Sequence, residues 1–595
     1  MPSPRPEPPT LRGLDREALG DLYRTMLRSR QRVERALRHR RAGVAAAVGG
    51  REAIGAAIGR VLVAGRDWIL LDEQDRTAPA EDPRRVVATS SSAVRFSFAV
   101  GCAEAVLEAP RVGERLQPPA RGDEIVLVAA DHDSSRGGAF WEASSTASDL
   151  KLPLVFVIED GDDATGVPER RRSVSRSAAT LPDLLIREVD GSDVLAVIEA
   201  LAAAVDHARS RSGPALVHAH VAGASSFGLD PTRDPLVGFR AVLLRERILR
   251  EDAIDKLEAR TERETEPSPG AHSRASRPSS MATILTDPAS HEPKRSGSPR
   301  TMAELRRLTL ADEMRRDGRV VLLVDESVAS GAAYQAETAF ELEREFGTHR
   351  VRRVVGGAVG RACGMAFRGL RPVVQLDLRA CRSDCFEELG ARSLPVVALV
   401  GYGDDEGPPS AAPSALVSLP GLGVVCPTTA LDAGGLLRTA IRGERPVVIL
   451  EHRELLRQSH NAAAYPGPDY TVPLEQAAVV RPGTDLTVVT YGAMLHYAVE
   501  ACRGLEHLGP EVELIDLRSL EPLDWETIRE SVTKTSKLLV VGGGRLVRPY
   551  GAEVAARAAE QLYTELDGPV RRLTPGRSAT RPAEIRRAIL ELAGW

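Results

Sequence analysis

The residues best suited to chemistry lie directly after short apolar runs that we predict to be buried strands. Asp131, His132 and Asp133 follow one such run, at residues 125–128. Imidazole and carboxylate groups together suit zinc or manganese, so this triplet is a candidate metal site. Three consecutive residues rarely all point at one ion, however, and we expect a solvated loop here instead.

Two histidines alternate along another predicted strand. His218 and His220 are two residues apart after an apolar run at residues 215–217, so both face the same side of the sheet and could line a cleft. The pattern fits better with histidines that serve the structure, and this is the role that we expect for His218 and His220. For His452 and His496 we expect roles in packing or at interfaces.

The cysteines and the glycine runs give weak signals. Cys381 and Cys385 are the only close pair among six scattered cysteines, which fits a reducing compartment better than a disulfide framework. A C-x-x-x-C pair without further partners is a poor zinc or redox motif. The glycine runs at residues 355–360 and 541–546 lack the G-x-G-x-x-G spacing, so we expect no dinucleotide site.

Short apolar runs alternate with helical patterns in three successive blocks. This alternation predicts an α/β protein of three doubly wound domains with mostly parallel sheets. Residues 260–300 are rich in Ser, Pro, Arg and Glu, and we expect a flexible linker there. The predicted organisation is a domain at residues 1–259, that linker, a domain at 301–468 and a domain at 469–595.

The composition limits the class of protein. The chain has 595 residues, of which 78 are basic and 83 acidic, for a net charge of −5. This balance suggests neither nucleic acid nor a membrane surface as a partner. No apolar run is long enough to span a bilayer, and the first residues lack the apolar core of a signal peptide. We therefore expect a cytoplasmic protein.

Several long segments match the motifs of a known enzyme family. The first block contains GREAIGAAIG at residues 50–59 and FWEASSTASDLKLPLVFVIED at 140–160. The later blocks contain GLRPVV at 369–374, PGLGVVCPTTALDAGGLLRTAI at 420–441 and a long match at 512–542. The first set resembles the α-type subunit, and the second the β-type subunit, of the decarboxylating first component of pyruvate and branched-chain 2-oxoacid dehydrogenases. The resemblance implies a transketolase-like fold with both subunit types fused.

The resemblance also implies a cofactor and partners. Members of this family bind thiamine diphosphate and Mg²⁺ between an α-type and a β-type domain, and they pass an acyl group to the lipoyl arm of an acyltransferase core. Their α₂β₂ assembly implies a homodimer for a fused chain. The cofactor supplies the difficult chemistry, while the protein supplies binding, orientation and electrostatics.

The α-type half departs from the family where the metal and diphosphate should bind. The family's G-D-G triplet is Asp131, His132 and Asp133 here, so His132 stands in place of the metal-binding aspartate and Asp133 in place of a glycine. Gly161 stands in place of the second metal ligand, an asparagine, and offers no side chain. His132, Asp133 and Gly161 are therefore cofactor-binding residues by position only, and His132 is the one metal ligand that the resemblance suggests.

Other family positions have changed as well. Val355 stands in place of the glutamate that protonates the cofactor, and Pro408 in place of a substrate-side histidine. In the α-type half, Ala46, Gln74 and Arg76 stand in place of a histidine, an arginine and a second histidine. Valine cannot transfer a proton. Because the metal and diphosphate positions have changed as well, we expect no catalytic residues and no bound thiamine diphosphate or Mg²⁺.

Three functional hypotheses follow. The first is a catalytically impaired or dead homologue with a structural or regulatory role, which docks on an acyltransferase core or pairs with an active paralogue. The second is an active thiamine-diphosphate-dependent enzyme with an aberrant site. The third is a binding module that uses the emptied cleft for another ligand. We favour the first, because the changes affect every family position that we compared.

Overall fold

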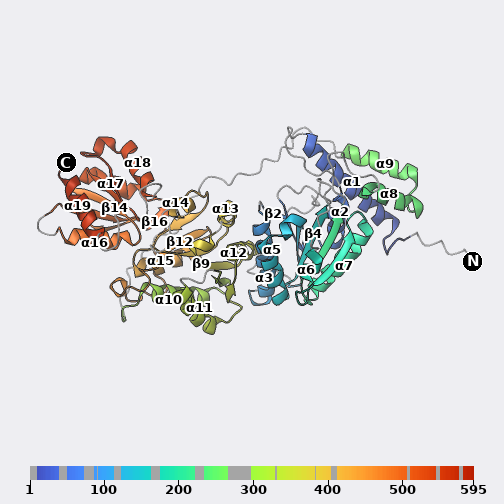
Figure 1. Ribbon diagram of the computed structural model, residues 1–595, viewed down its shortest axis with the longest axis horizontal. Helices are drawn as coiled ribbons and strands as arrows, with labels where there is room; N and C mark the ends of the chain where they lie inside the picture. The colour runs from blue at the N-terminus through green and yellow to red at the C-terminus, as the bar shows by residue number, and fades with distance from the viewer. Residues whose placement is uncertain are drawn as a thin grey trace, which may run out of the picture. The chain divides into compact units, whose positions relative to one another are not determined.

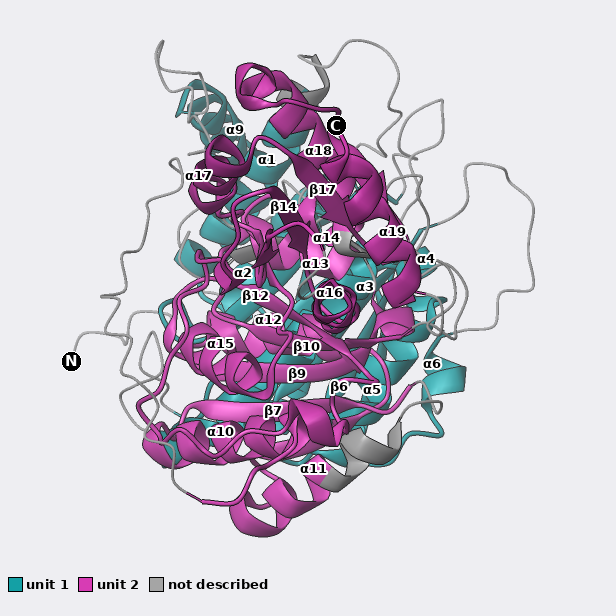
Figure 2. Cartoon of the chain, turned by 90° about the vertical axis from the view of Figure 1, so that its left-hand side faces the viewer, with its two compact units in different colours: residues 1–277 teal, residues 278–595 magenta. Residues whose placement is uncertain are grey.

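The computed structural model divides into two compact units, unit 1 at residues 1–277 and unit 2 at residues 278–595 (Figure 2). The structure describes residues 10–38, 50–72, 86–89, 91–112, 122–161, 174–221, 233–264, 297–327, 332–381, 383–403, 412–505, 509–543, 550–574 and 581–595.

Unit 1 is built on a six-stranded parallel sheet (Figure 1). In spatial order its strands are β2 (Val86–Thr89), β1 (Trp68–Asp72), β3 (Val126–Asp131), β4 (Leu154–Gly161), β6 (Ala215–Val221) and β5 (Leu185–Asp190). The central strands are apolar on both faces, as expected of a parallel sheet that helices cover on both sides. Their carboxyl ends meet at one edge, where doubly wound sheets bind ligands.

Helices cover both faces of this sheet. They are α1 (Arg16–Arg38), α2 (Glu52–Val61), α3 (Ser92–Val112), α4 (His132–Ser135), α5 (Gly138–Asp149), α6 (Val174–Ala178), α7 (Val194–Arg209), α8 (Pro235–Arg245) and α9 (Glu251–Glu264). On one face α2 and α7 pack against β1, β3, β4 and β6. On the other, Phe96 of α3 and Phe140 of α5 pack against Phe156 of β4, with ring centroids between 5.4 and 6.3 Å apart.

The linker was predicted to begin earlier in the sequence than the structure allows. Helix α9 continues to Glu264, so residues 260–264 are helical where we expected flexible chain. Three interactions explain the extension: Arg260 pairs with Glu264 one turn later at 2.7 Å, Arg28 of α1 pairs with Glu264 at 2.8 Å, and Thr261 is buried. Such pairs stabilise the last turn of a helix that its composition alone would leave frayed. Residues 265–296 lie outside the described part of the chain.

Unit 2 holds two sheets. The first has seven strands in the order β16 (Ser519–Glu521), β11 (Gly423–Val425), β12 (Val447–His452), β10 (Val397–Tyr402), β9 (Arg371–Asp377), β7 (Val320–Asp325) and β8 (Val351–Val354). The second has five, in the order β13 (Ala478–Arg481), β15 (Val512–Asp516), β14 (Leu486–Thr490), β17 (Leu538–Val541) and β18 (Arg571–Leu573). Pairing is parallel throughout, except for β16 with β11 and β13 with β15.

Strand β16 joins the two sheets of unit 2. It comes from the third block of the sequence, yet it pairs with β11 and so completes the sheet of the second block. The helices of this unit are α10 (Met302–Arg316), α11 (Ala332–Phe346), α12 (Ala358–Phe367), α13 (Ser383–Ala391), α14 (Ala412–Val417), α15 (Ala430–Arg442), α16 (Met494–Arg503), α17 (Trp525–Thr535), α18 (Gly551–Gln561) and α19 (Arg581–Ala593). Helix α10 begins at a capping box of Thr301 and Glu304, which fixes the first turn of the helix.

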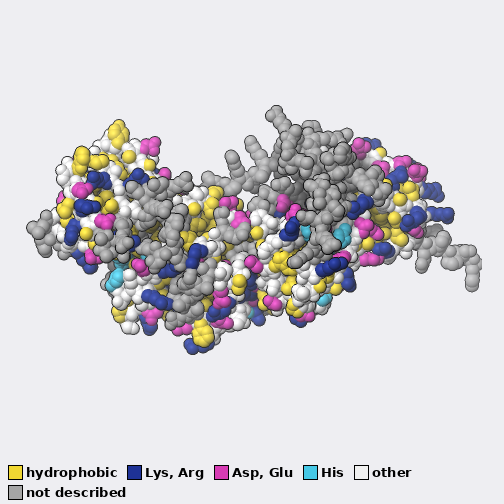
Figure 3. Space-filling model, viewed as in Figure 1, with side chains coloured by type: hydrophobic (Ala, Val, Ile, Leu, Met, Phe, Trp, Pro, Cys, Tyr) yellow, Lys and Arg dark blue, Asp and Glu magenta, His cyan; other side chains and the backbone are white. Residues whose placement is uncertain are grey.

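The predicted fold class is confirmed: the chain is an α/β protein with three mostly parallel sheets. No helix among the described residues is long and apolar enough to cross a membrane. On the face drawn in Figure 3, the described basic and acidic side chains are interspersed over both units, as the nearly balanced composition leads one to expect.

Candidate functional site

His132 is the first residue of α4, directly after β3 at the carboxyl edge of the first sheet. Asp131 caps this helix, because its carboxylate accepts a hydrogen bond from the Ser134 amide at 2.8 Å. Burial opposes the ionisation of Asp131, but the hydrogen bonds from Ser134 hold the pKa of its carboxyl group below the usual value. The cap turns His132 inward, where the residue is 7% exposed, and leaves the Asp133 side chain 82% exposed.

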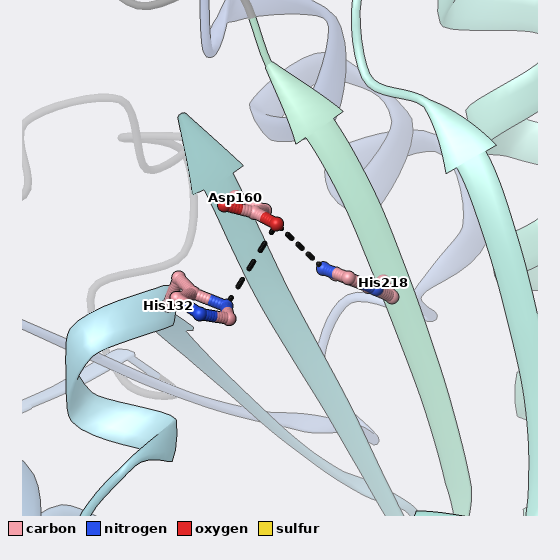
Figure 4. A group of neighbouring side chains, drawn as sticks. All are labelled: His132, Asp160 and His218. Carbon is pink, nitrogen blue, oxygen red and sulfur yellow. Dashed lines mark hydrogen bonds and ion pairs between the residues drawn. The ribbon is translucent and has the colours of Figure 1, made fainter. Parts of the chain in front are cut away.

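His132 meets residues of the two neighbouring strands (Figure 4). Asp160 lies near the end of β4, and His218 and His220 lie on β6, where Asp160 is in register with His220. The Asp160 carboxylate oxygen Oδ2 is 3.2 Å from Nε2 of His218, 3.8 Å from Nδ1 of His132 and 3.9 Å from Nδ1 of His220. One ligand atom each from His132, Asp160 and His218 lies within 4.8 Å of the others.

A hydrogen bond with Ser175 orients the His218 ring of the cluster. Nδ1 of the fully buried His218 is 2.7 Å from the Ser175 hydroxyl, which directs the opposite ring nitrogen toward Asp160. Burial lowers the pKa of His218 and the nearby His220 lowers it further, although Asp160 opposes both, so the imidazole is biased toward its neutral, metal-binding form. Nδ1 of His132 is buried and has no hydrogen-bond partner among the described residues.

The three residues expected to bind the cofactor by their position, His132, Asp133 and Gly161, lie in different surroundings. His132 is part of the cluster. Asp133 is not, because its side chain points to solvent, where its carboxylate is 3.8 Å from the Arg136 guanidinium. Gly161 lies beside the cluster without a side chain, and the preceding residue, Asp160, supplies the carboxylate. The expectation that His132 lies in a solvated loop was wrong, because it begins a capped helix and is buried.

Sequence reasoning missed Asp160, and for His218 it favoured a structural role over a place in a cleft. The available signal was the spacing of His218 and His220, which placed both on one face of a strand. The sequence did not show which strand lies beside β6. The neighbour is β4, although β5 lies between β4 and β6 in the sequence.

In unit 2, the position expected for the proton-donating glutamate carries no acid. Val355 directly follows β8 and is 68% exposed. The nearby Asp377, at the end of β9, accepts hydrogen bonds from the Arg379 side chain at 2.9 Å and is paired with Arg453. Glu451 of β12 is buried and pairs with the equally buried Arg306 at 2.6 Å. Both carboxylates are thus held in ion pairs with arginines.

The remaining family positions lie outside the described residues. These are Ala46, Gln74, Arg76 and Pro408.

Three protein-family models match separate parts of the chain. Residues 100–221 match the family described as dehydrogenase E1 component, residues 298–459 the transketolase pyrimidine binding domain, and residues 475–592 the transketolase C-terminal domain.

Curated relatives match a little under half of the chain. It is 32% identical over 285 residues to the 2-oxoisovalerate dehydrogenase subunit beta of Bacillus subtilis, a match that spans 45% of this chain and 86% of that protein. It is 31% identical over 292 residues to the pyruvate dehydrogenase E1 component subunit beta of Staphylococcus epidermidis, across 46% of this chain and 89% of that one.

Solved structures match the full length. Transketolase from Leishmania mexicana superimposes with a TM-score of 0.63 at 14% identity, with 98% of both chains covered. A transketolase mutant from Pichia stipitis gives a TM-score of 0.65 at 13% identity, with 97% of both chains covered. Identities this low show the fold alone. Together with the family matches and the β-subunit relatives, they show that the chain belongs to the thiamine-diphosphate-dependent 2-oxoacid dehydrogenase E1 family of the transketolase-like superfamily, with α-type and β-type parts fused in one polypeptide.

Proposed function

We propose that this chain is a catalytically impaired member of the E1 family with a structural or regulatory role. One observation carries the proposal: where the family places the metal that bridges the diphosphate to the protein, the side chains present are those of His132, Asp160 and His218. This donor set does not fit Mg²⁺, which takes oxygen ligands in a near-ideal octahedron and keeps several waters.

The same edge is also unsuited to a diphosphate. Phosphates bind well where backbone amides are available at a helix N-terminus, but the Asp131 carboxylate already accepts the Ser134 amide of α4. Asp160 adds a second negative charge 3.2 Å from His218. Two carboxylates facing a diphosphate repel it, so the proposal assigns no step to thiamine diphosphate.

The exposed Val355 in unit 2 supports the same proposal. General acid–base groups contribute roughly 10²–10⁴-fold each to rate, and a valine supplies none of this. Restoring one half of the site would leave the other half unsuited. Loss in both units is therefore better explained by relaxed selection on catalysis than by a change of substrate.

Calorimetric titration of the full chain with thiamine diphosphate in the presence of Mg²⁺ tests the proposal. We expect no saturable heat from folded protein at millimolar ligand, and no turnover of pyruvate or branched-chain 2-oxoacids with an artificial electron acceptor. An active E1 of the same family, run in parallel, is the positive control. A dissociation constant in the micromolar range or tighter, with turnover, would overturn the proposal.

The proposed partner is an acyltransferase core or an active paralogue. One relative is named as a subunit of an E1 component, and residues 475–592 of this chain match the transketolase C-terminal domain. Co-sedimentation of the purified chain with an acyltransferase core tests this docking, with residues 1–264 alone as a control that lacks the β-type part. No binding by the full chain, or equal binding by the control, would contradict it.

We also propose a homodimer, the equivalent of an α₂β₂ body for a fused chain. Multi-angle light scattering should give twice the 63.9 kDa mass of one chain. A monomer at micromolar concentration would rule the homodimer out.

A further inference from the structure

We propose that His132, Asp160 and His218 bind one divalent transition-metal ion of the zinc class at the carboxyl edge of the first sheet. This site goes beyond the proposed function and does not depend on it, because it requires neither thiamine diphosphate nor catalysis. It uses two imidazoles and one carboxylate, drawn from α4, β4 and β6.

The distances suit such an ion. Zinc–nitrogen and zinc–oxygen bonds of about 2.0–2.2 Å at the tetrahedral angle place ligand atoms roughly 3.4 Å apart. Here Asp160 Oδ2 is 3.2 Å from His218 Nε2 and 3.8 Å from His132 Nδ1. The widest separation in the set is within 4.8 Å, so small side-chain rotations complete the geometry.

An unsatisfied atom points to the ion. Nδ1 of His132 is buried and has no hydrogen-bond partner among the described residues, and 3.8 Å from Asp160 is too long for a hydrogen bond. A buried ring nitrogen without a partner is costly, and a purely structural hydrogen-bonded cluster leaves it so. A cation beside Asp160 would give the His132 nitrogen the partner that it lacks.

The surroundings have the features of a metal site. Metal-binding histidines almost always use their second ring nitrogen in a hydrogen bond that fixes the tautomer. His218 does so with Ser175 at 2.7 Å, which leaves Nε2 directed at Asp160. His220, whose Nδ1 is 3.9 Å from the same carboxylate oxygen, lies at the open side, where a fourth ligand or water would enter.

The ligand types select the metal. Two imidazoles favour zinc and other first-row transition metals over Mg²⁺ and Ca²⁺, which prefer all-oxygen sites. Three protein ligands leave at least one position open, as in zinc sites that bind water or a small ligand.

Zinc affinity of the full, untagged chain tests the proposal. Metal-free protein is titrated with Zn²⁺ in competition with a chromophoric chelator, and Co²⁺ is added separately to read the coordination geometry from its visible spectrum. We expect one equivalent of Zn²⁺, bound far more tightly than Mg²⁺. Loss of an outer hydrogen-bonding residue typically weakens a metal site 10–100-fold, so loss of a ligand in H132A or D160N should weaken Zn²⁺ binding by about 100-fold or more.

The matched control is D133N. Asp133 is next to His132 in sequence but its side chain is 82% exposed, so this variant should bind Zn²⁺ like the parent chain. His218 is fully buried and its replacement endangers the fold, so H132A carries the test, with circular dichroism in chelator as a check that it is folded. Equal zinc affinity in the parent, H132A and D160N, or no binding at all, would overturn the proposal.

Discussion

The two units differ in how the polar residues at the edges of their sheets are paired. In unit 1, His132 and Asp160 lie 3.8 Å apart without a direct hydrogen bond, and a buried ring nitrogen has no partner among the described residues. In unit 2, the carboxylates of Asp377 and Glu451 are each held by arginines. An edge whose charges are neutralised within the protein serves stability, whereas an edge with available donor atoms is suited to a ligand. The two units therefore differ in what the polar residues at their sheet edges can do.

The largest expected effect comes from removing Arg306, which leaves Glu451 buried and unpaired. Breaking a buried ion pair costs about 3–5 kcal/mol, so R306M should lower the free energy of unfolding of unit 2 by this order. Burial already raises the pKa of Glu451 against the opposing effect of Arg306, and without Arg306 it rises further. A folded-state pKa above the unfolded one costs stability as the pH rises, so the defect should shrink at acid pH.

Hydrogen exchange resolved by peptide measures this effect, because a chain of two units has no single unfolding free energy. The control is the double variant R306M/E451Q, which removes the uncompensated charge and should recover part of the loss. If R306M leaves exchange in β12 unchanged, the pair is not structural and the contrast between the two edges fails.

A smaller effect compares one residue from each edge in the presence of chelator. D377A removes a carboxylate that accepts charged hydrogen bonds from Arg379 and Arg453, and it should destabilise unit 2 by about 2 kcal/mol. H132Q removes a ring nitrogen without a hydrogen bond, and it should change unit 1 by less than about 1 kcal/mol. Unit-resolved hydrogen exchange measures both.

The pH dependence sharpens this second test. Burial opposes the ionisation of Asp377, but its hydrogen bonds with Arg379 and the charge of Arg453 hold the pKa below the usual value. A depressed folded-state pKa gives stability above the unfolded pKa that is lost as the pH falls through the folded one. The difference between D377A and the parent chain should therefore fade in acid, and a constant difference would contradict the ion-pair explanation.

The smallest expected effect is that of V355E. Val355 is 68% exposed, so a glutamate there should change the stability of unit 2 by no more than about 0.5 kcal/mol. It should not restore turnover with thiamine diphosphate and a 2-oxoacid, because the edge of unit 1 does not fit the family's metal. V355Q is the uncharged control. Turnover in V355E alone would show that unit 1 still binds the cofactor.

Much of the fold follows from hydrophobic period, but the candidate site depends on register. The runs at residues 125–128 and 215–217 predicted strands that the structure extends to Asp131 and Val221. Position-by-position comparison with the family placed Gly161, which has no side chain to offer, at the position of the second metal ligand, whereas the side chain that meets His218 is that of Asp160. Neighbouring strand residues face opposite sides of a sheet, so a one-residue error exchanges the faces.

Other parts of the site were beyond the reach of the sequence. His132 is directed inward by a helix cap that Asp131 makes with Ser134, a local hydrogen bond that no spacing rule specifies. His218 becomes a candidate ligand only once β4 and β6 are known to be neighbours. The last turn of α9, which ends at Glu264, was missed for a similar reason: it pairs with Arg28 of α1, which is far away in the sequence.

Strand β16 limits how this polypeptide can be divided. A chain ending at residue 468 would lack Ser519–Glu521, and β11 would then present unpaired backbone amides and carbonyls at a sheet edge. Open edges of this kind recruit strands from other molecules and promote aggregation. A split into separately encoded polypeptides between the second and third blocks should therefore be damaging.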